Sequence, residues 1–270
     1  MTKILLVLLA ISLSVFAYSD YDMDGVDDKT DQCPNTPFSD LVNTKGCSVK
    51  SLESLHHFDI IFGINYSQTS YETLENTDTI SQSLQIDYYY KNFSLQASSS
   101  YYNSQSATYN NSGTNDSFLG AYYKLNPTSK LTLRLGAGAI IPTYKSDLNN
   151  NNTDFTASAS LSYMIRNANL FGGYSYTVVN DDDIVAQSVA YQNTNSYNFG
   201  LGFYPTSKVY ISGAYNSSDS IYKDVDMINT VSINVFYNID ANWFTTINYA
   251  YGLSDTTSDN YASLRVGYYF

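Results

Sequence analysis

The sequence predicts an all-β fold: a transmembrane up-and-down antiparallel β-barrel of about 12 strands, preceded by a short N-terminal segment of the calcium-binding type. Segments of alternating polarity run from His56 to the C-terminus. The connections between them alternate between short turns and long polar stretches, which is typical of outer-membrane barrels. The last strand ends the chain on an aromatic residue, Phe270. The same pattern is compatible with about 10 or 14 strands, because strand boundaries read from sequence are inexact.

The last strand alternates between an apolar face and a polar face. Its apolar face carries Ala262, Leu264, Val266, Tyr268 and Phe270. Such a strand suits a position between lipid and an aqueous lumen, with its end in an aromatic girdle. It resembles the C-terminal assembly signal of bacterial outer-membrane β-barrel proteins. The resemblance implies that Tyr268 and Phe270 engage the outer-membrane assembly machinery, and that the chain resides in the cell outer membrane in contact with its lipid.

Composition agrees with a barrel and excludes nucleic-acid binding. The chain contains 28 tyrosines, aromatic residues make up 16% of it, and only 14% of its residues are charged. Tyrosine suits strands and membrane interfaces. The formal net charge is −12, and no basic patch is present to bind nucleic acid.

The N-terminus is predicted to be a signal peptide covering residues 1–17. Lys3 precedes an apolar run from Ile4 to Phe16, and Val15-Phe16-Ala17 has the small-residue spacing of a cleavage site. The run is too short to span a bilayer as a helix. We expect cleavage after Ala17 and export of the remaining chain.

The next segment, residues 18–55, contains an acidic loop with the spacing of a calcium site. Carboxylates stand at positions one, three, five, nine and twelve of the loop, a glycine at six, and a residue offering its backbone carbonyl at seven. These residues are Asp20, Asp22, Asp24, Asp28, Asp31, Gly25 and Val26, respectively. Hard cations such as Ca²⁺ prefer this set of oxygens. Asp31 departs from the usual glutamate at position twelve, and its shorter side chain reaches less far.

The residues after the loop extend the motif. Cys33-Pro34-Asn35-Thr36-Pro37 leads to Lys45-Gly46-Cys47, and two close cysteines in an exported chain favour a disulfide. The whole pattern over residues 20–47 resembles a thrombospondin type 3 repeat, of the kind found beside OmpA-type and OprF-type barrels. The resemblance implies bound Ca²⁺ and a Cys33–Cys47 bridge. The alternative is an acidic, solvated linker without metal.

The barrel is predicted to occupy residues 56–270. The expected strands are 56–67, 79–90, 93–103, 115–125, 131–144, 153–166, 169–179, 190–204, 208–217, 226–239, 242–253 and 261–270. Their apolar faces are clear, whereas their polar faces carry small uncharged residues. A soluble β-sandwich would also alternate, but its water-facing side would be rich in lysine and glutamate. The short turns fall on the side of both barrel termini, so residues 18–55 are expected in the periplasm.

Six charged residues fall on inward faces by the alternation of the strands. They are Asp59, Asp87, Lys124, Arg134, Arg166 and Arg265. Charges that line a pore bias which solutes pass. Alternatively, these residues pair with one another and fill the lumen. A barrel of about 12 strands lies between filled and open examples, so both interpretations remain open.

The sequence favours a porin-like protein that lets small hydrophilic solutes pass. The alternative is a closed-lumen structural or surface-interaction protein that acts through its extracellular loops. We expect no enzymatic activity, because the two histidines, His56 and His57, begin the first strand and no hydrolytic triad has its usual general base. The sequence sets no oligomeric state.

Overall fold

The computed structural model describes residues 20, 22, 25–34, 36, 42–48, 56–70, 75–108, 110–144 and 152–270. The chain divides into two compact units, Met1–Ser54 and Leu55–Phe270. The expected signal peptide, residues 1–17, lies outside the described residues, as does Asp24 of the acidic loop. Among the residues described, no helix is long and apolar enough to cross a membrane.

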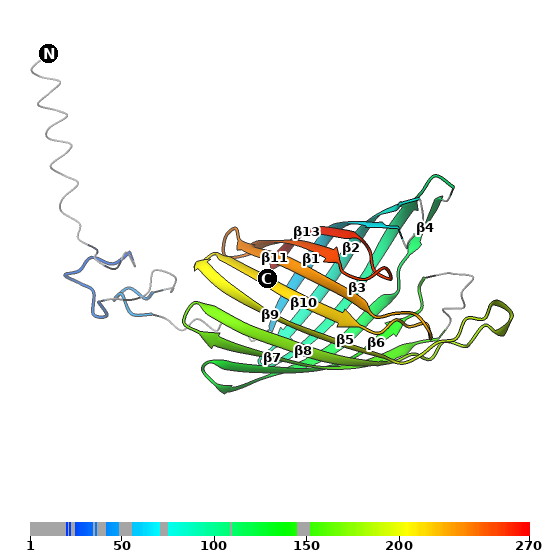
Figure 1. Ribbon diagram of the computed structural model, residues 1–270. Helices are drawn as coiled ribbons and strands as arrows, with labels where there is room; N and C mark the ends of the chain where they lie inside the picture. Colours follow the sequence, from blue (N-terminus) through cyan, green and yellow to red (C-terminus); the bar gives the residue numbers. More distant parts are fainter. Residues whose placement is uncertain are drawn as a thin grey trace, which may run out of the picture. The chain divides into compact units, whose positions relative to one another are not determined.

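The second unit is an antiparallel β-barrel (Figure 1). Its strands are β1 (His56–Thr69), β2 (Thr77–Tyr90), β3 (Phe93–Gln105), β4 (Asn110–Thr114), β5 (Ser117–Thr128), β6 (Leu131–Ile141), β7 (Asp154–Ile165), β8 (Ala168–Val178), β9 (Thr194–Thr206), β10 (Val209–Ser218), β11 (Ile228–Asn238), β12 (Trp243–Gly252) and β13 (Asn260–Tyr269). Consecutive strands pair with each other, except that β5 pairs with β3 instead of β4. β1 pairs with β13 from Asp59↔Tyr269 to Gln68↔Asn260. The pairing of first and last strands closes the barrel.

Twelve strands form the wall. In the described part of the chain thirteen strands make one sheet, but β4 pairs with β3 alone, which leaves twelve. β3 pairs through residues 101–105 with β4 and through residues 93–98 with β5. The prediction of a 12-stranded barrel is therefore confirmed. The predicted strands 93–103 and 115–125 leave residues 104–114 outside any strand, which is wrong in part, because β4 pairs with the end of β3.

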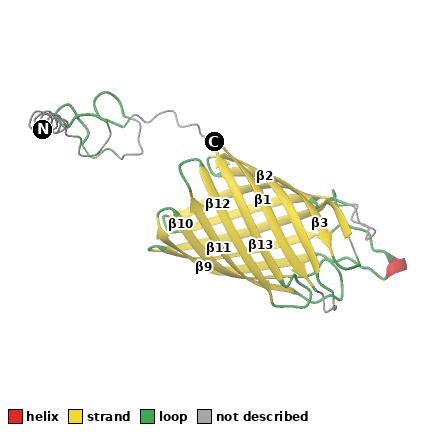
Figure 2. Cartoon of the chain, turned by 90° about the horizontal axis from the view of Figure 1, so that it is seen from above, coloured by secondary structure: helices red, strands yellow, loops and turns green. Residues whose placement is uncertain are grey.

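The two ends of the barrel differ in their connections. One end, here called the short-turn end, carries tight turns such as Lys91–Asn92 and Arg166–Asn167. Among the described residues, the opposite end, the long-loop end, carries residues 142–144, 152–153, 179–193 and 219–227, including the 3₁₀ turn η2 (Val185–Gln187). The C-terminus lies at the short-turn end, away from the long loops (Figure 2). The alternation expected from the sequence is present.

The outer surface is an apolar band between two aromatic belts. In the band, Ile64, Leu161, Leu201 and Ile233 expose 51%, 47%, 61% and 58% of their surface. Large exposed aromatic residues at the short-turn end are Phe58, Tyr90, Phe93, Tyr123, Tyr163, Phe203, Tyr237, Trp243 and Phe270. Those at the long-loop end are Tyr66, Tyr101, Phe155, Tyr174, Tyr176, Tyr197, Phe199, Tyr249 and Tyr251. In water such a surface would aggregate, whereas a bilayer solvates the band and both belts.

Phe270 and Tyr268, the residues expected to act in assembly, complete the belt at the closing strands. The Phe270 N–H donates to the Phe58 carbonyl at 2.9 Å. The Tyr268 ring meets those of Phe270 and Trp243 edge to face, with centroids 4.6 and 4.8 Å apart. These contacts anchor the end of β13 at the short-turn end.

The first unit is held by a disulfide and one buried threonine. Cys33 and Cys47 are bonded, with Cα atoms 4.9 Å apart, which confirms the expected bridge. Thr36 is 7% exposed; its hydroxyl donates to the Gly46 carbonyl at 2.7 Å, and its N–H donates to Asp22 Oδ2 at 2.7 Å. Thr36 thus connects the acidic loop to the disulfide-bonded loop.

The orientation of the barrel wall can be tested with adjacent residues of β7. We expect Leu161→Arg to destabilise the barrel by about 2–4 kcal/mol, because it places a charge in the lipid-facing band. Ser160→Arg, on the opposite face, should cost less. Urea unfolding in lipid vesicles, followed by the shift in electrophoretic mobility on folding, measures both. Equal losses for the two variants would contradict the assignment of faces.

Candidate functional site

The barrel interior receives most of the charged side chains that were expected there. Asp59 and Asp87 lie directly opposite each other on β1 and β2, on the face opposite the exposed Phe58, Ile60 and Ile86. Arg265 lies on the inner face of β13, between the exposed Leu264 and Val266. Lys124 and Arg134 are direct partners across β5 and β6. The five residues therefore belong to one side of the wall, which runs from β13 through β1, β2, β3 and β5 to β6.

Arg166 is placed differently. β7 ends at Ile165, and Arg166 begins the turn to β8 with a left-handed φ of 58°. The alternation of side chains applies only within a strand. The expected inward position of Arg166 is therefore corrected: its side chain is exposed in a turn at the short-turn end.

Arg265 reaches across β1 to the second strand. Arg265 pairs with Gly63 on β1. Because Gly63 has no side chain, the Arg265 side chain can cross β1 at this point. The guanidinium donates to Gln85 Oε1, and Gln85 Nε2 donates to Asp87 Oδ2 at 2.7 Å. The amide thus links the positive group to the carboxylate. The sequence reading missed Gln85, although it stands two residues before Asp87 on the same face.

A second group of polar contacts surrounds Arg134. Its Cζ lies 3.7 Å from the centre of the Tyr122 ring, a cation–π contact. The Tyr122 hydroxyl donates to Gln96 Oε1 at 3.0 Å. Both Arg134 and Arg265 are near enough to Asp87 to attract it electrostatically. Opposite charges are therefore distributed over this wall and are linked through amides and tyrosines.

Inward aromatic rings lie against glycines of neighbouring strands. A Cβ on Gly136 would collide with the Tyr122 ring, and one on Gly267 would collide with Phe244. The same relation holds for Gly138 with Phe118, Gly200 with Phe171, and Gly202 with Tyr210. Because the missing side chains leave room, the rings pack against the wall. This packing keeps bulky groups away from the axis of the barrel.

Three cavities follow one another along the inner surface of β1 and β2. The first, about 400 Å³, lies at the short-turn end beside Asp59, Asp87 and Tyr89. The second, about 240 Å³, lies beside Ser83, Gln85 and Arg265. The third, about 570 Å³, lies at the long-loop end beside Ser67, Thr79 and Ser104. The register of these strands therefore orders the cavities from one end of the barrel to the other.

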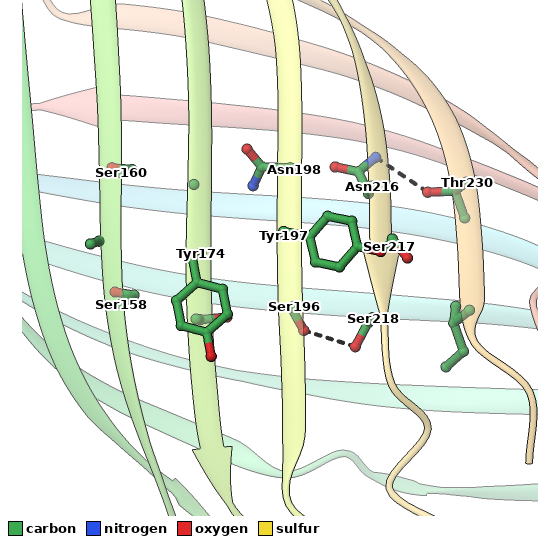
Figure 3. Close-up of a pocket in the computed structure, with 14 residues that line it drawn as sticks. Ser158, Ser160, Tyr174, Ser196, Tyr197, Asn198, Asn216, Ser217, Ser218 and Thr230 are labelled. Atoms are coloured by element: carbon green, nitrogen blue, oxygen red, sulfur yellow. Dashed lines mark hydrogen bonds between the residues drawn. The ribbon is translucent and has the colours of Figure 1, made fainter.

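The opposite wall carries an uncharged polar hollow of about 310 Å³ (Figure 3). Most of its inward residues on β7 to β11 are hydroxyls and amides, with one glycine and the apolar Ile228: Ser158, Ser160, Gly173, Ser175, Ser196, Asn198, Asn216, Ser218, Ile228 and Thr230. Asn216 Nδ2 donates to Thr230 Oγ1 at 3.2 Å, and Ser196 donates to Ser218 at 2.8 Å. The described lining of this hollow contains no charged side chain. The interior thus has one charged wall and one neutral wall.

The loops at the long-loop end are tied together by hydrogen bonds. Gln192 Nε2 donates to the carbonyls of Ser220 and Tyr222 at 3.0 and 3.2 Å. Asp183 accepts from the Tyr191 N–H at 2.8 Å, and Asp181 accepts from the Asn152 N–H at 3.0 Å. The acidic run of residues 181–183 therefore helps to order these loops.

At the short-turn end, Asp240 stabilises the turn between β11 and β12. Its Oδ1 accepts from the backbone N–H groups of Trp243 at 2.8 Å and Asn242 at 2.9 Å. These bonds, with a smaller contribution from Lys208, lower the pKa of Asp240. Asp240 therefore stays ionised at neutral pH and fixes the turn beside the first cavity.

The acidic loop of the first unit is described at all of the expected calcium-binding positions except Asp24. Gly25 adopts a left-handed φ of 91°, and its N–H donates to Asp20 Oδ2 at 2.9 Å. Asp22 Oδ1 is buried and accepts no hydrogen bond from the residues described. A buried carboxylate oxygen without a donor suits a cation. No group of three or more metal-binding side chains occurs within the described residues, which omit Asp24. Val26, Asp28 and Asp31 belong to the same loop.

Comparisons with known proteins identify the fold. No protein-family model and no curated protein matches the sequence. An outer-membrane channel from Pseudomonas putida F1 is similar in structure, with a TM-score of 0.66 and 10% identity over 83% of this chain and 100% of that chain. The NanC porin gives a TM-score of 0.52 and 14% identity over 78% and 97%. The KdgM porin gives 0.51 and 12% over 77% and 99%. The chain therefore has the fold of outer-membrane channels.

Proposed function

We propose that the protein is an outer-membrane channel that lets small hydrophilic solutes pass passively through the barrel interior. The observation that carries this proposal is the series of cavities from the short-turn end to the long-loop end, each with polar groups in its lining. Two further features support it: the aromatic rings pack against glycines in the wall, and the neutral hollow offers uncharged hydrogen-bonding groups. The fold shared with channels and porins agrees with it.

We also propose which end of the barrel faces the periplasm. The signal peptide directs export, the C-terminal strand engages the assembly machinery, and the short-turn end faces the periplasm. The first unit then lies in the periplasm, and the long loops lie outside the cell. The aromatic belts support a membrane position. We propose no catalytic role, because His56 contacts Tyr88 at 2.6 Å and His57 stacks on Tyr269, as expected for interfacial residues.

We propose that the layer of Ile61, Gln85 and Arg265 is the level that limits the path. Ile61 is 8% exposed and lies directly opposite Gln85. Arg265 extends over both strands at the next level. Because this layer separates the first two cavities, its charge decides which ions cross. If the layer closes the lumen completely, the protein is instead a structural or surface-interaction barrel.

Planar bilayer recordings at low salt test the channel and the role of Arg265 together. We expect unitary openings of the wild type. Arg265→Glu should shift the reversal potential in a salt gradient toward the value of a cation-selective pore, because the substitution makes the charge of the limiting layer more negative by two. Lys223→Glu, in a long loop, provides a control of equal charge change and should move the reversal potential less. A protein without openings, or an unchanged reversal potential in Arg265→Glu, contradicts the proposal.

The aromatic packing predicts an effect of substitution at Gly136. In Gly136→Val the new side chain occupies the space of the Tyr122 ring, so the ring and Arg134 must move toward the axis. We expect a lower unitary conductance, restored by the double variant Gly136→Val, Tyr122→Ala. Gly173→Ala is the control, because its nearest neighbours stand at 3.3 Å or more. An unaltered conductance in Gly136→Val would show that the path does not pass Tyr122.

We also propose that the first unit binds Ca²⁺ through Asp20, Asp22, Asp24, Asp28 and Asp31 and the Val26 carbonyl. Calorimetry of the full chain in detergent should show saturable binding in the range of about 0.1–1 mM or tighter. Asp22→Ala should weaken it at least about tenfold, because a buried ligand is lost. Asp240→Ala, in a barrel turn, should leave it intact. Absence of a binding isotherm up to about 5 mM would leave the acidic-linker alternative.

A further inference from the structure

The first cavity has a composition that the passage of neutral solutes does not require. It lies at the short-turn end and is built by β11, β12, β13, β1 and β2, which are consecutive in the sheet. Its volume is about 400 Å³. Its lining includes three carboxylates, Asp59, Asp87 and the turn residue Asp240, and the aromatic residues Tyr89, Phe236, Trp243, Phe244 and Tyr269. Asp59 and Asp87 project from neighbouring strands, whereas Asp240 is engaged by the backbone of its own turn. We call this cavity the vestibule.

Asp59 and Asp87 form a like-charge pair. They are direct partners across β1 and β2 and face the same side, an arrangement that is destabilising when both groups are charged. Asp87 is 8% exposed. Its Oδ2 accepts from Gln85, and Arg134 and Arg265 attract it from farther away. For Asp59 the corresponding neighbours are Asp87, which repels it, and His57, which attracts it. Asp59 is therefore the less compensated charge.

Asp59 also offers an acceptor that the described residues leave unused. Its Oδ2 accepts from the Tyr89 hydroxyl at 3.1 Å. Its Oδ1 is buried, and no donor among the described residues reaches it. A buried carboxylate oxygen without a partner costs free energy unless something positive or hydrogen-bonding occupies the space beside it. The position of this oxygen indicates that a donor or a cation belongs in the vestibule.

The aromatic residues specify what kind of cation fits. Phe236 and Phe244 lie with ring centroids 5.5 Å apart, and Phe244 packs on Gly267. Tyr269 stacks on His57 with centroids 5.1 Å apart. Ring faces attract alkylated ammonium groups, which are large and weakly hydrated. A bare metal ion would need several closely spaced oxygens and far less than 400 Å³.

We propose that the vestibule is a binding site for an organic cation with an alkylated or primary ammonium head. The ammonium group lies between Asp59 and Asp87, and its carbon substituents lie against Phe236, Phe244 and Tyr269. The two negative charges draw the cation from the aqueous mouth of the barrel. The site opens at the short-turn end, so its occupation does not depend on passage through the limiting layer of Ile61, Gln85 and Arg265.

Calorimetry of the full chain in detergent tests the site, with choline and spermidine as the cations. 3,3-Dimethyl-1-butanol is the control for choline, since it has the same shape without the charge. We expect saturable binding of both cations and none of the alcohol. Asp59→Asn and Asp87→Asn should each weaken binding at least about tenfold, because each removes a partner of the ammonium group. Asp219→Asn, at the long-loop end, should leave binding unchanged.

Two further variants separate recognition from folding. Asp87→Glu keeps the charge and should retain choline binding, whereas Phe244→Leu should weaken choline about 3–30-fold through the loss of a ring face. The heat-dependent shift in electrophoretic mobility shows whether each variant is folded. The proposal fails if neither cation binds up to about 20 mM, if the alcohol binds as well as choline, or if the Asp59→Asn, Asp87→Asn double variant binds normally. Because this readout is binding, it is independent of whether the barrel conducts.

Discussion

The pairing of β1 with β13 is the interaction on which the barrel depends. Hydrocarbon offers no partner to a backbone N–H or carbonyl group, so a sheet crosses a membrane only when it has no free edge. Ten residue pairs, from Asp59↔Tyr269 to Gln68↔Asn260, remove that edge. The same pairing places Phe270 beside Phe58 and brings Arg265 beside Gly63. Closure therefore fixes the end of the aromatic belt and the position of Arg265 in the interior together.

The inward side chains determine how much of the barrel interior is filled. A barrel of this size has room for inward side chains and some water, but its large aromatic residues would obstruct it if they projected toward the axis. Glycines at positions such as 136, 200, 202 and 267 let those rings lie along the wall. The charged groups are concentrated on β13, β1, β2, β5 and β6, while β7 to β11 present hydroxyls and amides. A solute in the lumen would thus meet a charged wall and a neutral one.

The strand number and the faces of the strands were predictable because a two-residue period is visible in sequence. Arg166 was wrongly predicted to face inward because the odd–even alternation was extended beyond Ile165, where the strand ends. β4 was missed because Asn110-Asn111-Ser112-Gly113-Thr114 has little β-propensity, and it pairs only because β3 continues beside it. The contacts of Arg265 with Gln85, and of Arg134 with Tyr122, depend on register and side-chain reach, which the period alone does not determine. The pairing of Asp59 with Asp87 across β1 and β2 also depends on register, so the period alone does not predict it.

The central claim is that the interior forms a path for small hydrophilic solutes. Swelling of liposomes that contain the purified protein, in isotonic solutions of neutral sugars of increasing size, tests it most directly. We expect swelling faster than that of protein-free liposomes, with a rate that falls steeply as the sugar grows, because each sugar has to pass the proposed limiting layer of Ile61, Gln85 and Arg265. Swelling no faster than that of empty liposomes, for even the smallest sugar, would contradict it.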